Sequence, residues 1–444
     1  MKNIRTTIGI VLLMIMSVSL MEGQEQNSLS LKNAISDALK DNPSMLSKIL
    51  LEKSASIKVN KQKLDLLPEL SLSAGIRHNF DIAATPIPMK FIDPTSGSDE
   101  IFPAKFATKN TANWGINFSY DLFNPAKLKL VSSEKKRAGL SKVDVLIQKA
   151  ILTNQVRIDY AGVLIAQKQL AYCKSDSLHA VRVLDYTQNR FAEGLASKED
   201  VLVAKENVNE MKLRGISANT DLLLAQNRLL SDIGLDPEEI QRERLNLTDR
   251  LEDLMLDMQA LDLHQNHSLG AERDSIQMAL SKEQWKKSNI AFLPTLTLVG
   301  FYGGNFYNKQ LNLTNSEHWY SNSYLGLKLS LPILEDFGKN EDRKIAKLNY
   351  KTDQIEAENN RINRAKALGE KQAQLDKAKK ELLIRKENVT LHEERFSILN
   401  EQMKEGQIYP AKLQEGLKDL QKSHTDYLQA IYNVFVANAN LELS

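Results

Sequence analysis

Two stretches of alternating polarity predict a first pair of β-strands. Between Leu70 and Arg77 every second residue is apolar, and serine, glycine or arginine stands between them; the stretch from Trp114 to Leu122 repeats the pattern. A period of two places the apolar side chains on one face of a strand and the polar ones on the other. We therefore expect strands over about residues 69–80 and 113–123.

A second pair of strands is predicted later in the chain. Leu296 and Leu298 alternate with threonines before the pattern blurs over Val299–Gly304, and leucines alternate with glycine, lysine and serine between Leu325 and Leu331. These stretches predict strands over about residues 295–303 and 321–332. Strands of about ten residues are long enough to cross a bilayer at a tilt.

Aromatic residues lie near the ends of the predicted strands. Because tryptophan and tyrosine are enriched at membrane–water interfaces, the following residues are candidates for an aromatic girdle: Trp114, Tyr120, Phe123, Tyr302, Trp319 and Tyr320. One hairpin alone would also fit a soluble sandwich with a half-buried sheet. Four strands cannot close a barrel of useful bore, since even eight strands fill their own interior. A membrane barrel would thus require several copies of the chain.

Long helices without proline account for much of the remaining sequence. Proline is absent from about residues 126–188 and 340–401, and a continuous helix of this length would reach roughly 90 Å. Steps of three and four residues then mark one apolar seam from Val201 to Leu229 and another from Leu413 to Leu441, as in coiled coils. His424 and Asn438 occupy seam positions in the second, where we expect polar residues to fix the register.

Short motifs recur in the same order in the two halves of the chain. Leu67-Pro68 returns as Leu293-Pro294, Glu193-Gly194 returns as Glu405-Gly406, and other pairs recur at offsets of about 211 to 226 residues. Such recurrence indicates an internal duplication. The expected organisation is a signal peptide over residues 1–23, a first repeat over 24–235, a linker over 236–250 and a second repeat over 251–444.

The first residues have the features of a secretory signal. Lys2 and Arg5 precede an apolar run from Ile8 to Leu20, which is too short to span a bilayer, so we expect cleavage near Gly23 in preference to an uncleaved anchor. After this segment no run of eighteen apolar residues occurs, which argues against a helical membrane protein. The single cysteine, Cys173, excludes an intrachain disulfide.

Neither the charge nor the motifs of the chain indicate a catalytic or a nucleic-acid-binding protein. The formal net charge is only +2, which gives no indication of nucleic acid. Histidines are scattered, no glycine-rich phosphate loop occurs, and no serine or cysteine stands in a nucleophile motif. The pair His264 and His267 has a metal-like spacing but falls at an expected turn between helices. We therefore expect no catalytic residues, no cofactor and no metal.

Several motifs together resemble the TolC-like outer membrane factor family, the exit ducts of bacterial efflux pumps and type I secretion systems. The opening Ser30–Pro43 resembles the first helix of that family with its Asn-Pro ending, and Leu67-Pro68 and Leu293-Pro294 resemble its entries into the strands. Ser330–Leu334 resembles the exit from the last strand. The most specific match is Arg190–Leu202, which is similar to the turn between helices at the periplasmic tip.

The resemblance implies an α+β membrane protein with a duplicated helix-strand-strand-helix unit. It implies a homotrimer in the outer membrane of a Gram-negative bacterium, with a 12-stranded outer-membrane β-barrel continued by a long periplasmic α-helical coiled-coil barrel. Outer-membrane lipid, a periplasmic membrane-fusion adaptor and an inner-membrane transporter would be its partners. Gly194 and Gly406 would form the periplasmic tip turns.

The family often carries two acidic residues, three positions apart, just after the second tip glycine. Here those positions hold Lys412 and Glu415, and the first copy has Asp200. We therefore expect a periplasmic aperture at which Glu415 contributes alone or pairs with Lys412 of a neighbouring subunit; alternatively, Glu415 only decorates a solvated helix. A ring of like charges at a constriction favours cations, and lysine would weaken that preference.

The expected function is a passive outer-membrane exit channel of a tripartite efflux pump or a type I secretion system. The alternative is a periplasmic coiled-coil adaptor or scaffold without a membrane barrel, which would share the signal peptide and the helical hairpins but would not need four strands with apolar outer faces. An exported enzyme with helical insertions is the third class, and the absence of a catalytic motif argues against it.

Overall fold

The computed structural model describes residues 28–95, 97, 101–240, 245–260, 268–290, 292–332 and 338–442. The expected signal peptide and the pair His264 and His267 lie outside these residues. The chain divides into two compact units. The helical unit comprises the described parts of Met1–Glu52, Ser141–Arg273 and Ala357–Ser444, and the sheet unit those of Lys53–Leu140 and Asp274–Glu356. Each unit takes segments from both expected repeats, so the units are not the repeats, and the division into repeats stays a prediction.

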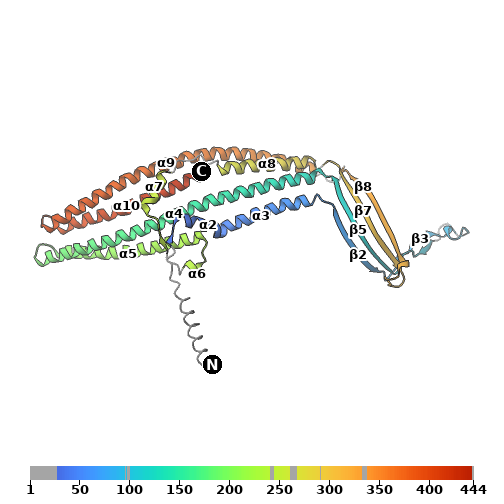
Figure 1. Ribbon diagram of the computed structural model, residues 1–444, viewed down its shortest axis with the longest axis horizontal. Coiled ribbons are helices and arrows are strands. Elements are labelled where there is room, and N and C mark those ends of the chain that lie inside the picture. The colour runs from blue at the N-terminus through green and yellow to red at the C-terminus, as the bar shows by residue number, and fades with distance from the viewer. Residues whose placement is uncertain are drawn as a thin grey trace, which may run out of the picture. The chain divides into compact units, whose positions relative to one another are not determined.

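The sheet unit contains one four-stranded antiparallel sheet (Figure 1). Its strands are β2 (Glu69–His78), β5 (Asn110–Phe123), β7 (Thr295–Asn308) and β8 (Trp319–Ser330), in the order β2-β5-β7-β8. β7 continues beyond the expected end at residue 303, because its blurred segment pairs on both sides, with β5 and with β8. The pairing of β5 with β7 joins the two halves of the chain in one sheet.

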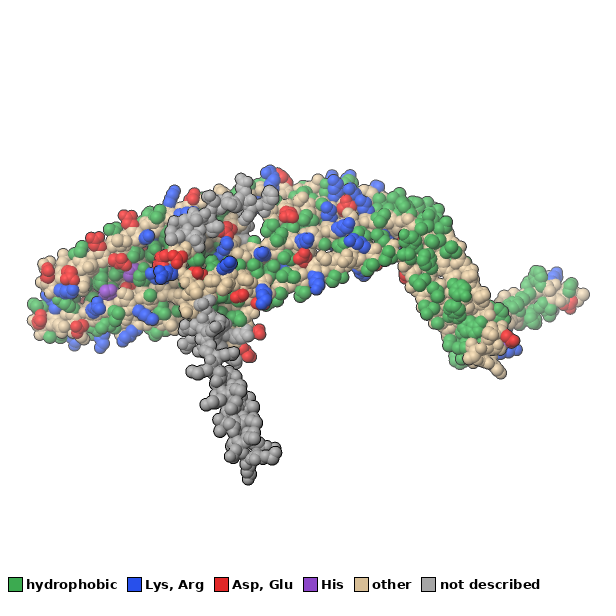
Figure 2. Space-filling model, in the orientation of Figure 1, with side chains coloured by type: hydrophobic (Ala, Val, Ile, Leu, Met, Phe, Trp, Pro, Cys, Tyr) green, Lys and Arg blue, Asp and Glu red, His purple; other side chains and the backbone are tan. Residues whose placement is uncertain are grey.

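The outer strands of the sheet, β2 and β8, leave their apolar side chains exposed. In the single chain Leu72 is 74% exposed and Leu327 is 66% exposed, and Leu70, Leu325 and Leu329 are similarly open. Figure 2 shows hydrophobic side chains gathered over this sheet. Soluble monomers rarely expose large contiguous apolar surfaces, so this face requires an apolar environment or a partner.

Between β2 and β5 the chain forms a separate small hairpin. It consists of β3 (Thr85–Pro88), the 3-10 turn η1 (Met89–Phe91) and β4 (Ile101–Ala104). A second short turn, η2 (Ser316–His318), precedes β8.

Helices of the sheet unit pack beside one another next to the strands. They are α3 (Pro43–Leu64), the first part of α4 (Pro125–Ala192), α8 (Leu269–Ile290) and the first part of α9 (Gly338–Lys404). The rings of Trp285 on α8 and Tyr350 on α9 stack at 5.8 Å, and Lys129 on α4 lies 3.3 Å from the carboxylate of Glu283 on α8. α4 and α9 contain 68 and 67 residues, so each is about 100 Å long.

Two helical hairpins form most of the helical unit (Figure 1). The second part of α4 returns as α5 (Lys198–Ile233), and the second part of α9 returns as α10 (Pro410–Glu442). Many of the seam positions expected from steps of three and four residues are buried, and the others, among them Val201, Leu222 and Tyr427, are half-buried. The buried ones include Ala204, Val208, Met211, Ala218 and Leu229 on α5, and Leu413, Leu417, Leu420, Ile431 and Leu441 on α10. The apolar period therefore correctly predicts the packed face of both returning helices.

The N-terminal part of the described chain is tied to these helices. Its elements are β1 (Ser28–Leu29) and α2 (Leu31–Asp41). β1 pairs in parallel with β6 (Asn246–Leu247). In sequence, β6 lies between α6 (Pro237–Ile240) and α7 (Leu251–Ala260). The carboxylate of Asp249 accepts a hydrogen bond from the Leu31 amide at 2.8 Å and lies 2.9 Å from the Tyr160 hydroxyl. Burial raises the pKa of Tyr160, so this hydroxyl stays protonated and able to donate.

None of the helices in the described part of the chain combines the length and the apolar character needed to cross a membrane.

Candidate functional site: the hairpin turns and the cluster beneath them

Both helical hairpins turn at a glycine with left-handed backbone geometry. Gly194 has φ of 73° and Gly406 has φ of 76°, a conformation that glycine adopts without the steric penalty of a Cβ atom. The hydrogen bonds are the same in both turns: the Leu195 amide donates to the Arg190 carbonyl at 2.8 Å, and the Gln407 amide donates to the Gln402 carbonyl at 2.8 Å. This is the Schellman arrangement that ends a helix.

The two turns lie beside each other in the helical unit. A Cβ atom added at Gly406 would lie 3.4 Å from the guanidinium of Arg190, which belongs to the other hairpin. The two Glu-Gly motifs of the duplicated sequence therefore form neighbouring turns. The assignment of this end to a periplasmic tip stays a prediction at this point.

Asp200 holds the start of α5 by a capping box. Its carboxylate accepts from the Ser197 amide at 2.9 Å and from the Ser197 hydroxyl at 2.8 Å, while the Ser197 hydroxyl oxygen accepts from the Asp200 amide at 3.0 Å. Such a reciprocal cap satisfies donors that the first helical turn leaves free. The carboxylate of Asp200 is thus engaged within its own turn.

Lys412 and Glu415 form an ion pair within one chain. The Lys412 ammonium lies 2.7 Å from the Glu415 carboxylate, and the side chains are 50% and 56% exposed. Exposed pairs of this spacing on a helix contribute only about 0.3–0.5 kcal/mol. The pair nevertheless places the positive charge of Lys412 next to the Glu415 carboxylate. If several subunits formed a ring of Glu415 carboxylates, the repulsion within that ring would therefore be weakened by the lysine of each chain itself.

An apolar cluster beneath the turns joins all four long helices. Val183 on α4, Val208 on α5, Phe396 on α9 and Leu417 on α10 are among its buried members. Along one side of the cluster Arg395 of α9 pairs with Asp419 of α10 at 2.6 Å, and Arg385 pairs with Asp426 at 2.7 Å. The cluster packs the two hairpins against each other, and the two ion pairs join α9 to α10 within the second hairpin.

Next to this cluster a histidine is buried among acidic and aromatic side chains. His424 of α10 is 5% exposed and stacks on the ring of Tyr172 of α4 at 3.9 Å. Its ring nitrogens each lie 3.6 Å from a carboxylate, that of Asp176 on α4 and that of Glu393 on α9. Burial raises the pKa of Tyr172 to about 12, so this tyrosine stays uncharged.

This cluster was only partly predicted by the sequence. His424 is at the expected seam position, and Asn438, the other polar seam residue, donates to the Glu442 carboxylate at 3.1 Å. The sequence analysis missed Asp176 and Glu393. A usable indication existed for Asp176, because Cys173, Asp176, Ala180 and Val183 are buried and follow steps of three, four and three residues. Because the apolar stripe of a helix faces the core, a carboxylate on that stripe is expected to be buried.

In the sheet unit, the candidate girdle residues fall at both ends of the strands. Trp114 packs edge-on against Tyr302 at 5.8 Å, and the indole of Trp319 donates to the Leu313 carbonyl at 2.9 Å, both toward the ends near the β3–β4 hairpin. Tyr120 and Phe123 lie toward the opposite ends, where β5 pairs with the start of β7. Their position at a lipid–water boundary stays a prediction.

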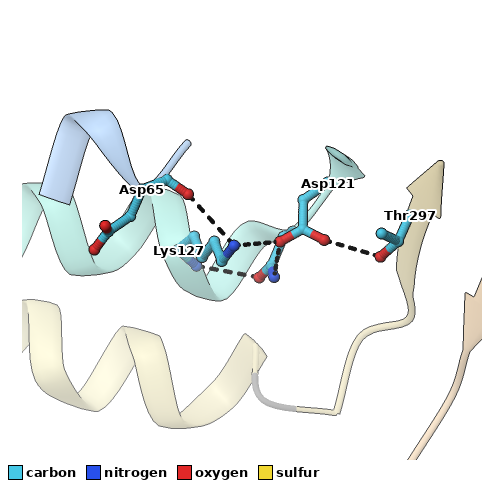
Figure 3. Close-up of polar contacts among 5 residues, drawn as sticks. Asp65, Asp121, Lys127 and Thr297 are labelled. Atoms are coloured by element: carbon cyan, nitrogen blue, oxygen red, sulfur yellow. Dashed lines mark hydrogen bonds and ion pairs between the residues drawn. The ribbon is translucent and has the colours of Figure 1, made fainter. Parts of the chain in front are cut away.

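A polar network, absent from the sequence-based candidates, fixes the passage from strand to helix (Figure 3). The Lys127 ammonium lies 2.6 Å from the Asp121 carboxylate and 3.4 Å from the Asp65 carbonyl. The Thr297 hydroxyl donates to the same carboxylate at 2.8 Å, as does the Asn124 amide at 3.0 Å. One aspartate thereby connects β5, β7, the start of α4 and the chain that leaves α3.

Among the residues that the structure describes, no group of three or more histidine, cysteine, aspartate or glutamate side chains is placed to hold a metal ion. Cys173 is buried.

Comparison with known proteins finds similarity to outer membrane efflux proteins. A family model described as outer membrane efflux protein matches residues 34–235. The outer membrane protein TolC of Vibrio cholerae serotype O1 is 24% identical over 313 residues, which cover 68% of this chain and 65% of the relative. The matched segment thus spans less than two thirds of that relative's length.

Solved structures share the fold over nearly the whole chain. The outer membrane protein VceC of Vibrio cholerae matches with a TM-score of 0.73 at 14% identity, covering 93% of this chain and 94% of that chain. A membrane protein of Pseudomonas aeruginosa matches with a TM-score of 0.75 at 15% identity and 93% coverage of both chains. The CmeC outer membrane channel of Campylobacter jejuni gives 0.73 at 15% identity, with 93% and 86% covered.

The α+β fold with its helical hairpins and four-stranded sheet is therefore that of the TolC-family outer membrane channels. By the match of residues 34–235, the curated relative and the shared fold, the chain is similar to the TolC-like outer membrane factors.

Proposed function

We propose that the chain is a passive exit channel of the outer membrane, part of a tripartite efflux pump or a type I secretion system. It carries substrates across the periplasm and the outer membrane and does no chemistry itself. Most of its mass, the helical part, lies in the periplasm of a Gram-negative bacterium. The energy for transport comes from a transporter in the inner membrane, to which a periplasmic membrane-fusion adaptor connects it.

The exposed apolar face of the sheet is the observation that carries this proposal. β2 and β8 are edge strands, and their leucines are open to the surroundings in the single chain. A strand edge with unpaired backbone N–H and C=O groups is not tolerated within lipid, so each edge strand must pair with another strand. Three copies would supply twelve strands and pair every edge, with the leucines toward lipid and Ser71, Asn117 and Lys328 toward the lumen.

The long helices support the periplasmic part of the proposal. α4 and α9 are each about 100 Å long, which exceeds the size of an ordinary domain core several times. Three copies of four helical columns would surround one tunnel. The Gly194 and Gly406 turns would be the end that faces the adaptor, and opening would require the hairpins to separate there.

The proposed aperture lies just beyond the second turn, at Lys412 and Glu415. Because the ion pair is satisfied within each chain at 2.7 Å, we expect the closed state to depend little on ion pairs between subunits. Paired charges also predict a weak preference for cations, in place of the strong preference of an all-acidic ring.

Fractionation followed by mass measurement tests the proposal. The full chain would be expressed with its leader, recovered from outer membranes in detergent and sized by native mass spectrometry. A trimer in the outer-membrane fraction is the expected result. A monomer or dimer that is soluble in water without detergent would overturn the channel proposal and would favour a periplasmic adaptor or scaffold.

A further inference from the structure

The helices of the sheet unit carry an excess of positive charge. Their segments are residues 53–64 of α3, 125–140 of α4, 274–290 of α8 and 338–356 of α9. These segments contain seventeen lysine and arginine residues but only seven aspartate and glutamate residues, which gives a formal net charge of +10. Because the whole chain carries +2, all the rest of the chain together carries −8. We call the four segments the basic belt.

Most of the positive charges of the basic belt are not neutralised within the chain. Five of the seventeen cations form ion pairs, namely Lys127, Lys129, Arg137, Lys286 and Lys344. Among the residues that the structure describes, the other twelve form no ion pair: Lys53, Lys58, Lys61, Lys63, Lys135, Lys136, Lys282, Lys287, Lys339, Arg343, Lys347 and Lys351. Ten of these twelve are exposed in the single chain, and the remaining two are half-buried.

Between the strands and the basic belt lies a collar of exposed apolar side chains. Its members are Leu64, Leu67, Leu122, Phe123, Leu128, Leu293 and Leu331. Leu122 and Leu331 continue the apolar alternation of β5 and β8, so the collar extends the apolar face of the sheet. Cations follow at once, since Lys127 and Lys129 flank Leu128. Lysines with their stems along apolar surface and their ammonium groups in a polar layer are favoured at membrane interfaces.

The basic side chains and the apolar face of the sheet are visible from the same side. Figure 2 shows lysine and arginine side chains gathered over the parts of α8 and α9 that adjoin the strands, next to the hydrophobic side chains over the sheet. Within this region the Lys347 ammonium of α9 lies 5.9 Å from the centroid of the Trp285 ring of α8. An apolar surface on the strands therefore continues into a basic surface on the helices.

The nearest cations lie within the depth of a headgroup layer. The hydrocarbon core of a bilayer is about 30 Å thick and the whole bilayer about 40–45 Å, so each headgroup layer measures roughly 5–8 Å. Lys61, Lys63 and Lys287 lie within three residues of the ends of α3 and α8, and Arg343 lies five residues after the start of α9. At 1.5 Å per residue these four are within about 8 Å of the helix ends.

We propose that the basic belt is a docking surface for anionic phospholipid headgroups in the membrane leaflet beside the helices. The inference rests on the proposed function, because that function places the sheet in the outer membrane and the helices on its periplasmic side. Clusters of lysine and arginine next to a membrane attract anionic lipids, and each such residue near the surface contributes about fivefold in affinity. A zwitterionic headgroup carries no net charge and gains no such attraction.

Lipid retention by the purified full-length protein tests the proposal. The protein in detergent would be mixed with equal amounts of palmitoyl-oleoyl phosphatidylglycerol and phosphatidylcholine, and the lipids that stay bound would be identified by native mass spectrometry. The wild type should retain phosphatidylglycerol about fivefold over phosphatidylcholine, or more. A belt variant with four substitutions should lose most of this preference: Lys61→Gln, Lys63→Gln, Lys287→Gln and Arg343→Gln.

A variant of the helical unit with the same change of charge is the matched control. Its four lysines are exposed and, in the described part of the chain, form no ion pair: Lys205→Gln, Lys212→Gln, Lys379→Gln and Lys386→Gln. This variant should keep the lipid preference of the wild type. Should the belt variant fail to fold, the pair Lys61→Gln and Lys63→Gln decides, since both side chains are exposed and should be replaceable without loss of packing.

Two results would overturn the lipid-docking surface and leave the channel intact. One is a trimer that retains the two lipids equally in the wild type. The other is an equal loss of preference in the belt variant and the control variant. A water-soluble monomer that retains no lipid would instead overturn the proposed function, and the docking surface with it.

Reversal potentials in a salt gradient separate lipid from a dissolved anion as the occupant. Cations that face lipid should leave the ion selectivity of the channel unchanged when they are replaced in the belt variant. A shift of selectivity toward cations, together with an unchanged preference for phosphatidylglycerol, would place the belt cations along the lumen. That outcome would refute lipid docking in favour of an anionic solute.

Discussion

The sheet unit and the helical unit distribute their apolar side chains in opposite ways. On β2 and β8 the leucines point outward, with Leu72 74% exposed, whereas on α10 the leucines of the seam are enclosed and Leu417 is 0% exposed. Charged side chains are spread over the helical unit and are sparse over the strands (Figure 2). One chain is therefore built for two environments: the helices bury apolar surface against each other in water, and the sheet presents it.

The largest expected effect on stability comes from creating a cavity in the core of the helical unit. Leu417→Ala removes a fully buried side chain from the cluster that joins all four long helices and should destabilise the helical unit by about 2–5 kcal/mol. Leu213→Ala on α5 is the matched control, because Leu213 is 67% exposed. Thermal unfolding in detergent measures both, and equal losses would contradict the assignment of α10 to the core.

The next largest effect is expected in the sheet, where the apolar side chains face outward and not into a core. Leu72→Arg places a charge on the outward face and should cost about 2–4 kcal/mol if that face meets the middle of a bilayer. Ser71→Arg, one position away and on the other face, should be tolerated. The measurement is the amount of folded protein in the outer-membrane fraction. Equal recovery of the two variants would argue against a lipid-facing sheet.

A smaller effect is expected at the hairpin turns. Gly194→Ala and Gly406→Ala force a Cβ into left-handed backbone, at a cost of about 1–2 kcal/mol each. Gly369→Ala on α9 should act in the opposite sense, since this glycine has no left-handed geometry and its added Cβ meets no atom within 4 Å; alanine favours a helix by about 1 kcal/mol. Melting temperatures should therefore fall for the turn variants and rise for Gly369→Ala.

The smallest effect on stability, but a measurable one on conduction, is expected at the proposed aperture. Lys412→Gln removes the positive partner of Glu415 at a cost of no more than about 0.5 kcal/mol. The channel should become more selective for cations, because up to three carboxylates would then lack their lysines. Reversal potentials in a salt gradient provide the measurement, with the exposed Lys418→Gln on the same helix as control. An unchanged potential would remove Glu415 from the conduction path.

Local patterns predicted most elements of the fold. Alternating polarity located the four long strands, and β5, β7 and β8 differ from the expected ranges by a few residues at their ends. The recurring Glu-Gly motif located both hairpin turns, and the structure shows that Gly194 and Gly406 adopt left-handed backbone geometry there. The candidate girdle residues came from such patterns and the aperture residues from the resemblance to the outer membrane factor family, and their roles remain predictions.

By itself, the sequence determined which face of each helix and strand is apolar and where each element turns, since both properties depend on neighbours within a few residues. Only the tertiary structure decided that β5 pairs with β7 across the two halves of the chain. It also brought Asp176, Glu393 and His424 together from three helices. Periodicity specifies that an apolar face must be covered but not which distant segment covers it. Several helices or strands of similar pattern could cover the same face, and the packing of the complete chain decides which of them does.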